Sequence, residues 1–229
     1  MSGPEQVGRD DSGALAARDH SVVLEARDVS VVRDGRAVVD GVSFTGLAGE
    51  LVGIGGPSGS GKTSLLTALS GLAAPDGGSV RMHGSPRVGM VLQGYGLVPV
   101  LTAAENVEIV LQADGRPAEE VSAAARVALG RVLVGELGDR LVDRLSGGQQ
   151  QRVAVARALV AEPGVLLADE PTSELDEVSR DHVVQELVAQ ARSGTLVVLA
   201  SHDRDVLSAC DRTLWMVNGQ LAAEPDRVG

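Results

Sequence analysis

The chain has 229 residues, a formal net charge of −11 and 44% hydrophobic residues. This length and apolar content suit one sizeable core, and no apolar run approaches the ~20 residues that a membrane-spanning helix needs. The negative charge disfavours a general nucleic-acid binder and direct docking on anionic lipid, because phosphate groups would repel the surface. We therefore expect no nucleic-acid partner, and any membrane role to run through a protein partner.

The first 20 residues differ in composition from the rest of the chain. Residues 1–20 are polar, charged and small, which predicts a disordered leader, and they lack the apolar region of a secretory signal. The single cysteine, Cys210, cannot form an internal disulfide, which favours a reducing cytoplasm. Cys210 as a nucleophile stays open, although a buried, inert thiol is the favoured interpretation. We expect one domain over residues 21–229.

Strand and helix signals alternate along this domain. Residues 22–32 alternate as a half-buried strand does, and a second strand near Ala37–Phe44 would pair with them as an antiparallel flap. Apolar runs predict further strands at Leu51–Ile54, Ser79–Met82, Val88–Leu92, Val165–Ala168 and Leu196–Ala200. Helix signals cover Ser64–Leu72, part of Pro117–Gly138, a segment from Ser146 to Pro163, and Asp181–Arg192. The alternation predicts an α/β fold with a mainly parallel sheet, the small flap and a helical subdomain over about 94–160.

Lys62 is the only lysine among 20 lysines and arginines, and its neighbours form a phosphate-binding pattern. The segment GPSGSGKT matches G-x-x-x-x-G-K-[ST] between a predicted strand and a predicted helix. Glycines let backbone N–H groups surround phosphates, Lys62 would reach the terminal phosphates, and Thr63 would offer its hydroxyl to Mg²⁺. A glycine-rich turn with a stray lysine is the alternative. The expected nucleotide contacts are Gly56, Pro57, Ser58, Gly59, Ser60, Gly61, Lys62, Thr63 and Ser64.

Two adjacent carboxylates follow the apolar run Val165–Ala168. Strand ends in open α/β sheets face the ligand crevice, so these side chains would lie beside the phosphates. Asp169 would hold Mg²⁺, and Glu170 would orient or deprotonate the attacking water. A solvated strand end would be the favoured interpretation if the phosphate loop were not present.

A third motif carries a family resemblance. The segment Leu145-Ser146-Gly147-Gly148-Gln149, continuing QQRVAVARAL, resembles the signature motif of the ATP-binding-cassette (ABC) ATPases. The resemblance covers about Val22 to Leu221. It implies that Ser146, Gly147, Gly148 and Gln149 contact ATP held by a second copy, because the free amides of the first helical turn would point at its γ-phosphate.

Two single residues match smaller elements of the same family. Gln93, in VLQGYGLVP, resembles the Q-loop glutamine, which implies contact with Mg²⁺ and with a membrane partner. His202, in LASHD, resembles the switch histidine that senses the γ-phosphate. With Lys62 and Glu170 it would complete the catalytic set.

Two other positions depart from the family pattern. Arg33, or its neighbour Val32, falls where the family stacks an aromatic residue on adenine. For Arg33, guanidinium stacking and a solvated turn arginine are equally open. Ser173–Asp176 resemble the D-loop at the dimer seam, with Glu174 in place of the usual small or amide residue. A negative charge near the bound phosphates would weaken closure.

The resemblance implies an ATP-hydrolysing subunit that binds ATP and Mg²⁺. Two such subunits, identical or not, would close around two MgATP and drive a separate transmembrane permease from the cytoplasmic side. The segments LLADEPT and LVPVLTAAENV are most similar to those of the lipoprotein-releasing and macrolide-exporter ATPases, which favours an exporter. The cargo stays open. The alternatives are a soluble ABC ATPase of an assembly or repair machine, and a regulatory binder that does not hydrolyse ATP.

Overall fold

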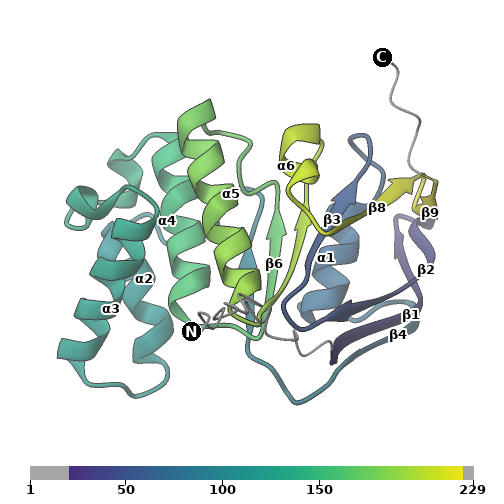
Figure 1. Cartoon of the computed structure of the whole chain (residues 1–229), viewed down its shortest axis with the longest axis horizontal. Coiled ribbons are helices and arrows are strands. Elements are labelled where there is room, and N and C mark those ends of the chain that lie inside the picture. Colours follow the sequence, from purple (N-terminus) through teal and green to yellow (C-terminus); the bar gives the residue numbers. More distant parts are fainter. Residues whose placement is uncertain (1–20, 224–229) are drawn as a thin grey trace, which may run out of the picture.

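The structure is a computed structural model that describes residues 21–223 (Figure 1). The predicted leader, residues 1–20, lies outside the described residues. The strands are β1 (Val22–Arg33), β2 (Arg36–Leu47), β3 (Leu51–Gly55), β4 (Gly77–Met82), β5 (Val88–Val91), β6 (Val165–Asp169), β7 (Leu196–Ala200), β8 (Arg212–Val217) and β9 (Gln220–Ala222). The helices are α1 (Lys62–Ser70), α2 (Ala103–Gln112), α3 (Ala118–Arg131), α4 (Gly147–Val160), α5 (Glu177–Arg192) and α6 (Arg204–Ser208), with 3₁₀ turns η1 (Gly135–Leu137) and η2 (Val142–Arg144).

The strands form two sheets. The larger sheet has six strands in the order β5-β6-β7-β3-β8-β9, and all neighbours are parallel except β8 and β9. The smaller sheet is antiparallel, in the order β2-β1-β4. The mainly parallel sheet and the antiparallel flap are therefore as predicted, with β4 as a third flap strand.

The central strands are continuous apolar runs because both of their faces are buried. In β6, Val165 and Leu167 belong to the core that α1 and the small sheet share, whereas Leu166 and Ala168 belong to the core beneath α4 and α5. Helix α1 therefore lies between the two sheets, and α4 and α5 cover the opposite face (Figure 1). This arrangement brings the carboxyl ends of β3, β6 and β7 to one edge.

Two helices begin earlier than the sequence predicts. Helix α5 begins at Glu177 because the side chain of Asp176 accepts a hydrogen bond from the amide of Ser179. Helix α1 begins at Lys62, so the lysine itself stands in the first turn. It ends where Gly71 adopts the left-handed conformation, at φ 77°.

Helix α2 was not predicted. Its start is marked by a capping box, in which Thr102 and Glu105 bond to each other's backbone amides. Helices α2, α3 and α4 bury side chains in one cluster, which also contains residues of the central sheet. The division into one domain over 21–229 with a helical subdomain over about 94–160 stays a prediction.

Candidate functional site

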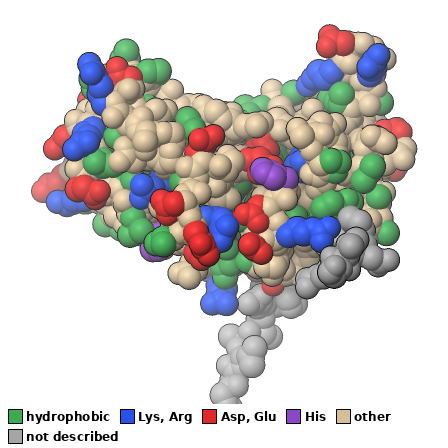
Figure 2. Space-filling view, turned by 90° about the horizontal axis from the view of Figure 1, so that it is seen from above, with side chains coloured by type: hydrophobic (Ala, Val, Ile, Leu, Met, Phe, Trp, Pro, Cys, Tyr) green, Lys and Arg blue, Asp and Glu red, His purple; other side chains and the backbone are tan. Residues whose placement is uncertain are grey.

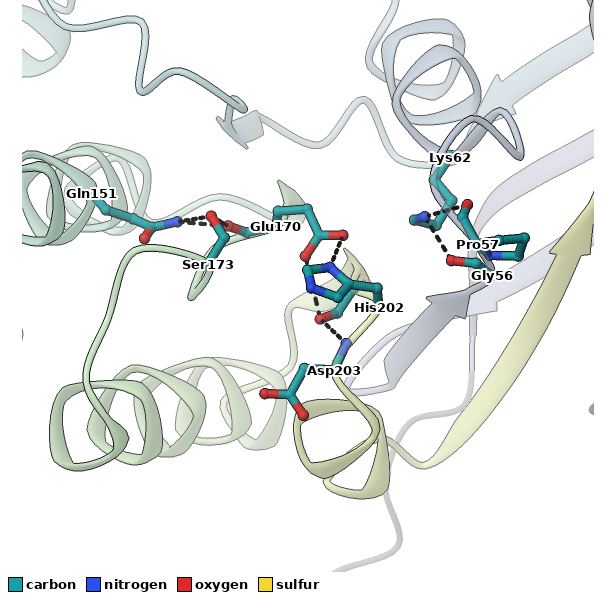
Figure 3. A network of polar contacts seen from close by, with 9 residues as sticks. Gly56, Pro57, Lys62, Gln151, Glu170, Ser173, His202 and Asp203 are labelled. Atoms are coloured by element: carbon teal, nitrogen blue, oxygen red, sulfur yellow. Dashed lines mark hydrogen bonds and ion pairs between the residues drawn. The ribbon is translucent and has the colours of Figure 1, made fainter. Parts of the chain in front are cut away.

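The glycine-rich loop joins β3 to α1. Gly61 precedes the helix at φ 103°, and a Cβ at this position would overlap the carbonyl oxygen of Val38, so only glycine fits. The side chain of Lys62 is buried, and its ammonium donates to the carbonyl oxygens of Gly56 (2.9 Å) and Pro57 (3.1 Å) (Figure 3). The loop thus holds a positive charge at the N-terminal end of α1.

Asp169 ends β6 and is buried. Burial raises the pKa of Asp169 above its ordinary value, as does the charge of Glu170, while a hydrogen bond from Thr63 and the charge of Lys62 lower it. Its Oδ1 atom is buried and has no hydrogen-bond partner among the described residues. An unpartnered carboxylate oxygen beside a hydroxyl and an ammonium is suited to a cation with oxygen ligands.

Glu170 follows with a backbone conformation that is rare outside glycine, at φ 49°. Two hydrogen bonds hold it: its amide donates to the carbonyl oxygen of Ala200 (2.9 Å), and its own carbonyl oxygen accepts from the side-chain amide of Gln151 (2.6 Å). Its carboxylate lies 2.9 Å from Nδ1 of His202 and accepts from the hydroxyl of Ser201 at 3.5 Å (Figure 3). The acid and the imidazole from adjacent strand ends therefore form one connected pair.

One cavity of about 530 Å³ joins these groups. Most of the residues predicted for ATP, Mg²⁺ and catalysis line it together: Ser58, Gly59, Gly61, Lys62, Thr63, Ser64, Gln93, Asp169, Glu170 and His202. Ser173, the first residue of the segment that resembles the D-loop, also lines the cavity, and so does Val38 of β2. Val38 carries no motif signal, since only the packing of β2 against the loop brings it there.

The remaining predicted residues lie outside the lining. Gly56 and Pro57 instead hold the ammonium of Lys62, and the hydroxyl of Ser60 is buried within the loop. Arg33 lies in the flap, where its guanidinium donates to the carbonyl oxygen of Val32 at 3.0 Å. Its role in stacking on adenine stays a prediction.

The signature residues also lie outside this cavity, at the start of α4. Ser146 is the N-cap, as predicted: its hydroxyl accepts from the amide of Gln149 at 3.3 Å, and the side chain of Gln149 accepts from the amide of Ser146 at 3.0 Å. The amides of Gly147 and Gly148 have no partner within the helix, because the first turn lacks carbonyls four residues earlier. The first turn contains no acidic residue, so α4 offers an anion-binding end.

Cys210 is partly buried. Burial, and then the charge of Asp211, raise the pKa of its thiol to about 12, so the sulfur is protonated at neutral pH. This supports the inert interpretation over a nucleophile.

The arrangement of these motifs has a known counterpart. The family model described as "ABC transporter" matches residues 39–173, which include the glycine-rich loop, the start of α4 and both carboxylates. The chain belongs to the ABC transporter family. The resemblance that the signature segment carries is confirmed, and the chain is an ATPase of this family.

ABC relatives with curated names are similar to most of the chain. The uncharacterized ABC transporter ATP-binding protein YbbA of Escherichia coli (strain K12) is 38% identical over 204 residues, which are 82% of this chain and 90% of that protein. The lipoprotein-releasing system ATP-binding protein LolD of Aquifex aeolicus (strain VF5) is 36% identical over 209 residues, 85% of this chain and 93% of that protein.

The solved ABC cassettes confirm the predicted fold class. The dimeric structure of a post-hydrolysis state of the ATP-binding cassette MJ0796 bound to ADP and Pi has a TM-score of 0.84 and 30% sequence identity, covering 90% of this chain and 99% of that one. Within residues 21–223, no helix is both long enough and apolar enough to cross a membrane.

Proposed function

We propose that this ABC ATPase binds MgATP in its cavity and pairs with a second copy, or with a near relative, to enclose two nucleotides. The observation that carries the proposal is the separation of two sets of residues. The catalytic groups and the glycine-rich loop share one cavity, whereas Ser146–Gln149 lie outside it on the same chain. A second copy is then needed to bring an α4 N-terminus to the phosphates.

The side chains of the cavity have distinct tasks in this proposal. Glu170 and His202, 2.9 Å apart, would orient the attacking water and accept its proton. Lys62 would leave the carbonyls of its own loop for the phosphates, and the first turn of α4 from the second copy would add backbone donors. Positioning and charge neutralisation suffice, because phosphoryl transfer to water needs no covalent step with the protein.

The residues present fit Mg²⁺. Asp169 offers a buried oxygen without a hydrogen-bond partner, and Thr63 and Gln93 line the same cavity, so these three would hold the ion. The described residues contain no cluster of three His, Cys, Asp or Glu suited to a metal, but Mg²⁺ is usually held by one or two carboxylates together with substrate phosphates. When bound, Mg²⁺ supplies positive charge to the phosphate oxygens.

The test of the ATPase is Glu170→Gln. This change keeps the size of the side chain and removes the base. We therefore expect an ATP affinity within about twofold of the parent's and a turnover at least ~100-fold lower than the parent's. With MgATP the variant should form a dimer in light scattering. Glu177→Gln, an exposed change in the first turn of α5, is the matched control and should behave as the parent does.

Two results would count against the proposal. Undiminished hydrolysis in Glu170→Gln would remove Glu170 from its role. An ATP-loaded variant that stays a monomer would contradict the enclosed pair of nucleotides.

The partner is proposed to be a membrane permease, with this subunit peripheral to the membrane on its cytoplasmic side. The similarity to a lipoprotein-releasing ATPase supports an exporter over an importer. Affinity purification from detergent-solubilised membranes should recover the permease with the tagged subunit. Recovery of a soluble assembly without a permease would favour the alternative machine.

A further inference from the structure

The D-loop, Ser173–Asp176, is fastened to the first turns of α4. The amide of Glu174 donates to the side-chain oxygen of Gln151 at 2.8 Å, and the amide nitrogen of Gln151 donates to the carbonyl oxygen of Glu170. Gln151 is buried, and its side chain links α4 to Glu170 at the end of β6 and to Glu174 in the D-loop. A Cβ on Gly148 would lie 2.7 Å from the carbonyl oxygen of Glu174, so the two backbones are in close contact. The position of Glu174 is thus set by its backbone.

The side chain of Glu174 lies beside the signature glycines. A Cβ on Gly147 would lie 3.3 Å from Oε2 of Glu174 and 3.1 Å from the hydroxyl of Tyr95. Burial, and then the negative charge of Glu174, raise the pKa of Tyr95 above its ordinary value. The loop of Tyr95 is in turn held by Arg157, which donates to the carbonyl oxygen of Tyr95 at 2.9 Å. A carboxylate and a phenol therefore occupy the space next to the first turn of α4.

We propose that Glu174 is an intramolecular competitor for the anion-binding first turn of α4, and so weakens the closure of two copies on nucleotide. The inference rests on the proposed function, in which this turn receives the γ-phosphate held by the other copy. In a single subunit the carboxylate interacts favourably with the positive end of the helix. In the closed pair the same carboxylate repels the incoming phosphate, and this happens at both sites of the dimer.

The experiment measures closure. In the Glu170→Gln background, Glu174→Gln is compared with Glu177→Gln, which removes the same charge three residues away at an exposed position. Charges near a helix terminus change equilibria by a factor of about two to five, and two sites act together, so we expect the dimer dissociation constant in saturating MgATP to fall at least about fivefold for Glu174→Gln. Glu177→Gln should change it by less than about twofold. An unchanged constant in Glu174→Gln overturns the competitor role.

This experiment separates the failure of the inference from that of the proposed function. If the parent dimerises with MgATP and Glu174→Gln does not tighten the dimer, only the competitor role fails. If Glu170→Gln alone and both double variants stay monomeric with ATP bound, the proposal of an enclosed dimer fails, and the competitor role fails with it.

Discussion

The ammonium of Lys62 lies among carbonyl oxygens of its own loop, in a space that excludes almost all solvent. A guanidinium is larger and planar, and it spreads its charge over a fork. We expect Lys62→Arg to lower ATP affinity at least about tenfold, nearly as much as Lys62→Ala, although the net charge is unchanged. Equilibrium binding of a labelled nucleotide measures this.

The reverse exchange at a surface position is the matched control for Lys62. Arg126→Lys, on the exposed side of α3, should leave nucleotide affinity as it is in the parent. Normal affinity in Lys62→Arg would show that the loop accepts either cation.

For Asp169 the prediction concerns the pH dependence of stability, because burial raises the pKa of its carboxyl group. The folded state then binds the proton more tightly than the unfolded state, so stability is lost as pH rises from the ordinary carboxyl range through the raised value. At neutral pH without Mg²⁺, Asp169→Asn should therefore raise the melting temperature, and the difference from the parent should shrink as the pH is lowered. MgATP should stabilise the parent more than the variant.

Thermal unfolding at several pH values checks the prediction for Asp169. Asp139→Asn, at an exposed position, is the control and should show neither effect. A variant that melts lower than the parent at neutral pH in the absence of nucleotide would contradict the prediction.

The sequence identified the residues of the site that local patterns mark. Lys62 stands where the glycine-rich loop gives way to α1, and Asp169 stands at the end of β6. The order of residue types at each place suffices to identify them. Val38 and Gln151 were not found, because their roles depend on contacts with segments far along the chain. No spacing between nearby residues could reveal such contacts.

At the scale of elements, α2 and α4 begin with the same device. The hydroxyls of Thr102 and Ser146 each accept a hydrogen bond from the backbone amide three residues later. In return, their own backbone amides donate to the side chains of Glu105 and Gln149. Replacing either with alanine should cost about 1 kcal/mol in the free energy of unfolding. Only Ser146→Ala should also weaken MgATP-dependent dimerisation, because only the start of α4 is proposed to meet the second nucleotide.

Thr102→Ala thus serves as the matched control for Ser146→Ala. Denaturant unfolding gives the stability of both variants, and light scattering gives their association. Equal association of the two variants would mean that Ser146 acts only as a helix cap.

The elements were predictable where burial alone dictates them. Leu196–Ala200 is a strand with the predicted bounds because a strand buried on both faces is a continuous apolar run. Helix α2 was missed although the T-x-x-E pattern of its capping box is present in the sequence. Strand β8 was missed as well, since its first four residues are all partly buried and the strand shows no alternation of buried and exposed residues.

The whole chain carries a formal net charge of −11. Figure 2 shows basic and acidic side chains interspersed on one face, with no continuous basic area on that face. Two copies that approach each other must therefore overcome repulsion between two negative bodies, of −11 each. The bound triphosphates add to the same sign of charge.

This repulsion predicts that salt strengthens closure. The Debye length falls from about 30 Å at 0.01 M to about 8 Å at 0.15 M ionic strength, so added salt screens the long-range repulsion while short contacts persist. In Glu170→Gln with saturating MgATP, the dimer dissociation constant should fall between these two conditions. Nucleotide occupancy is measured in parallel at each salt concentration, because salt also weakens the contact between Lys62 and phosphate. A constant that rises steadily with salt at full occupancy would show instead that attraction between opposite charges holds the two copies together.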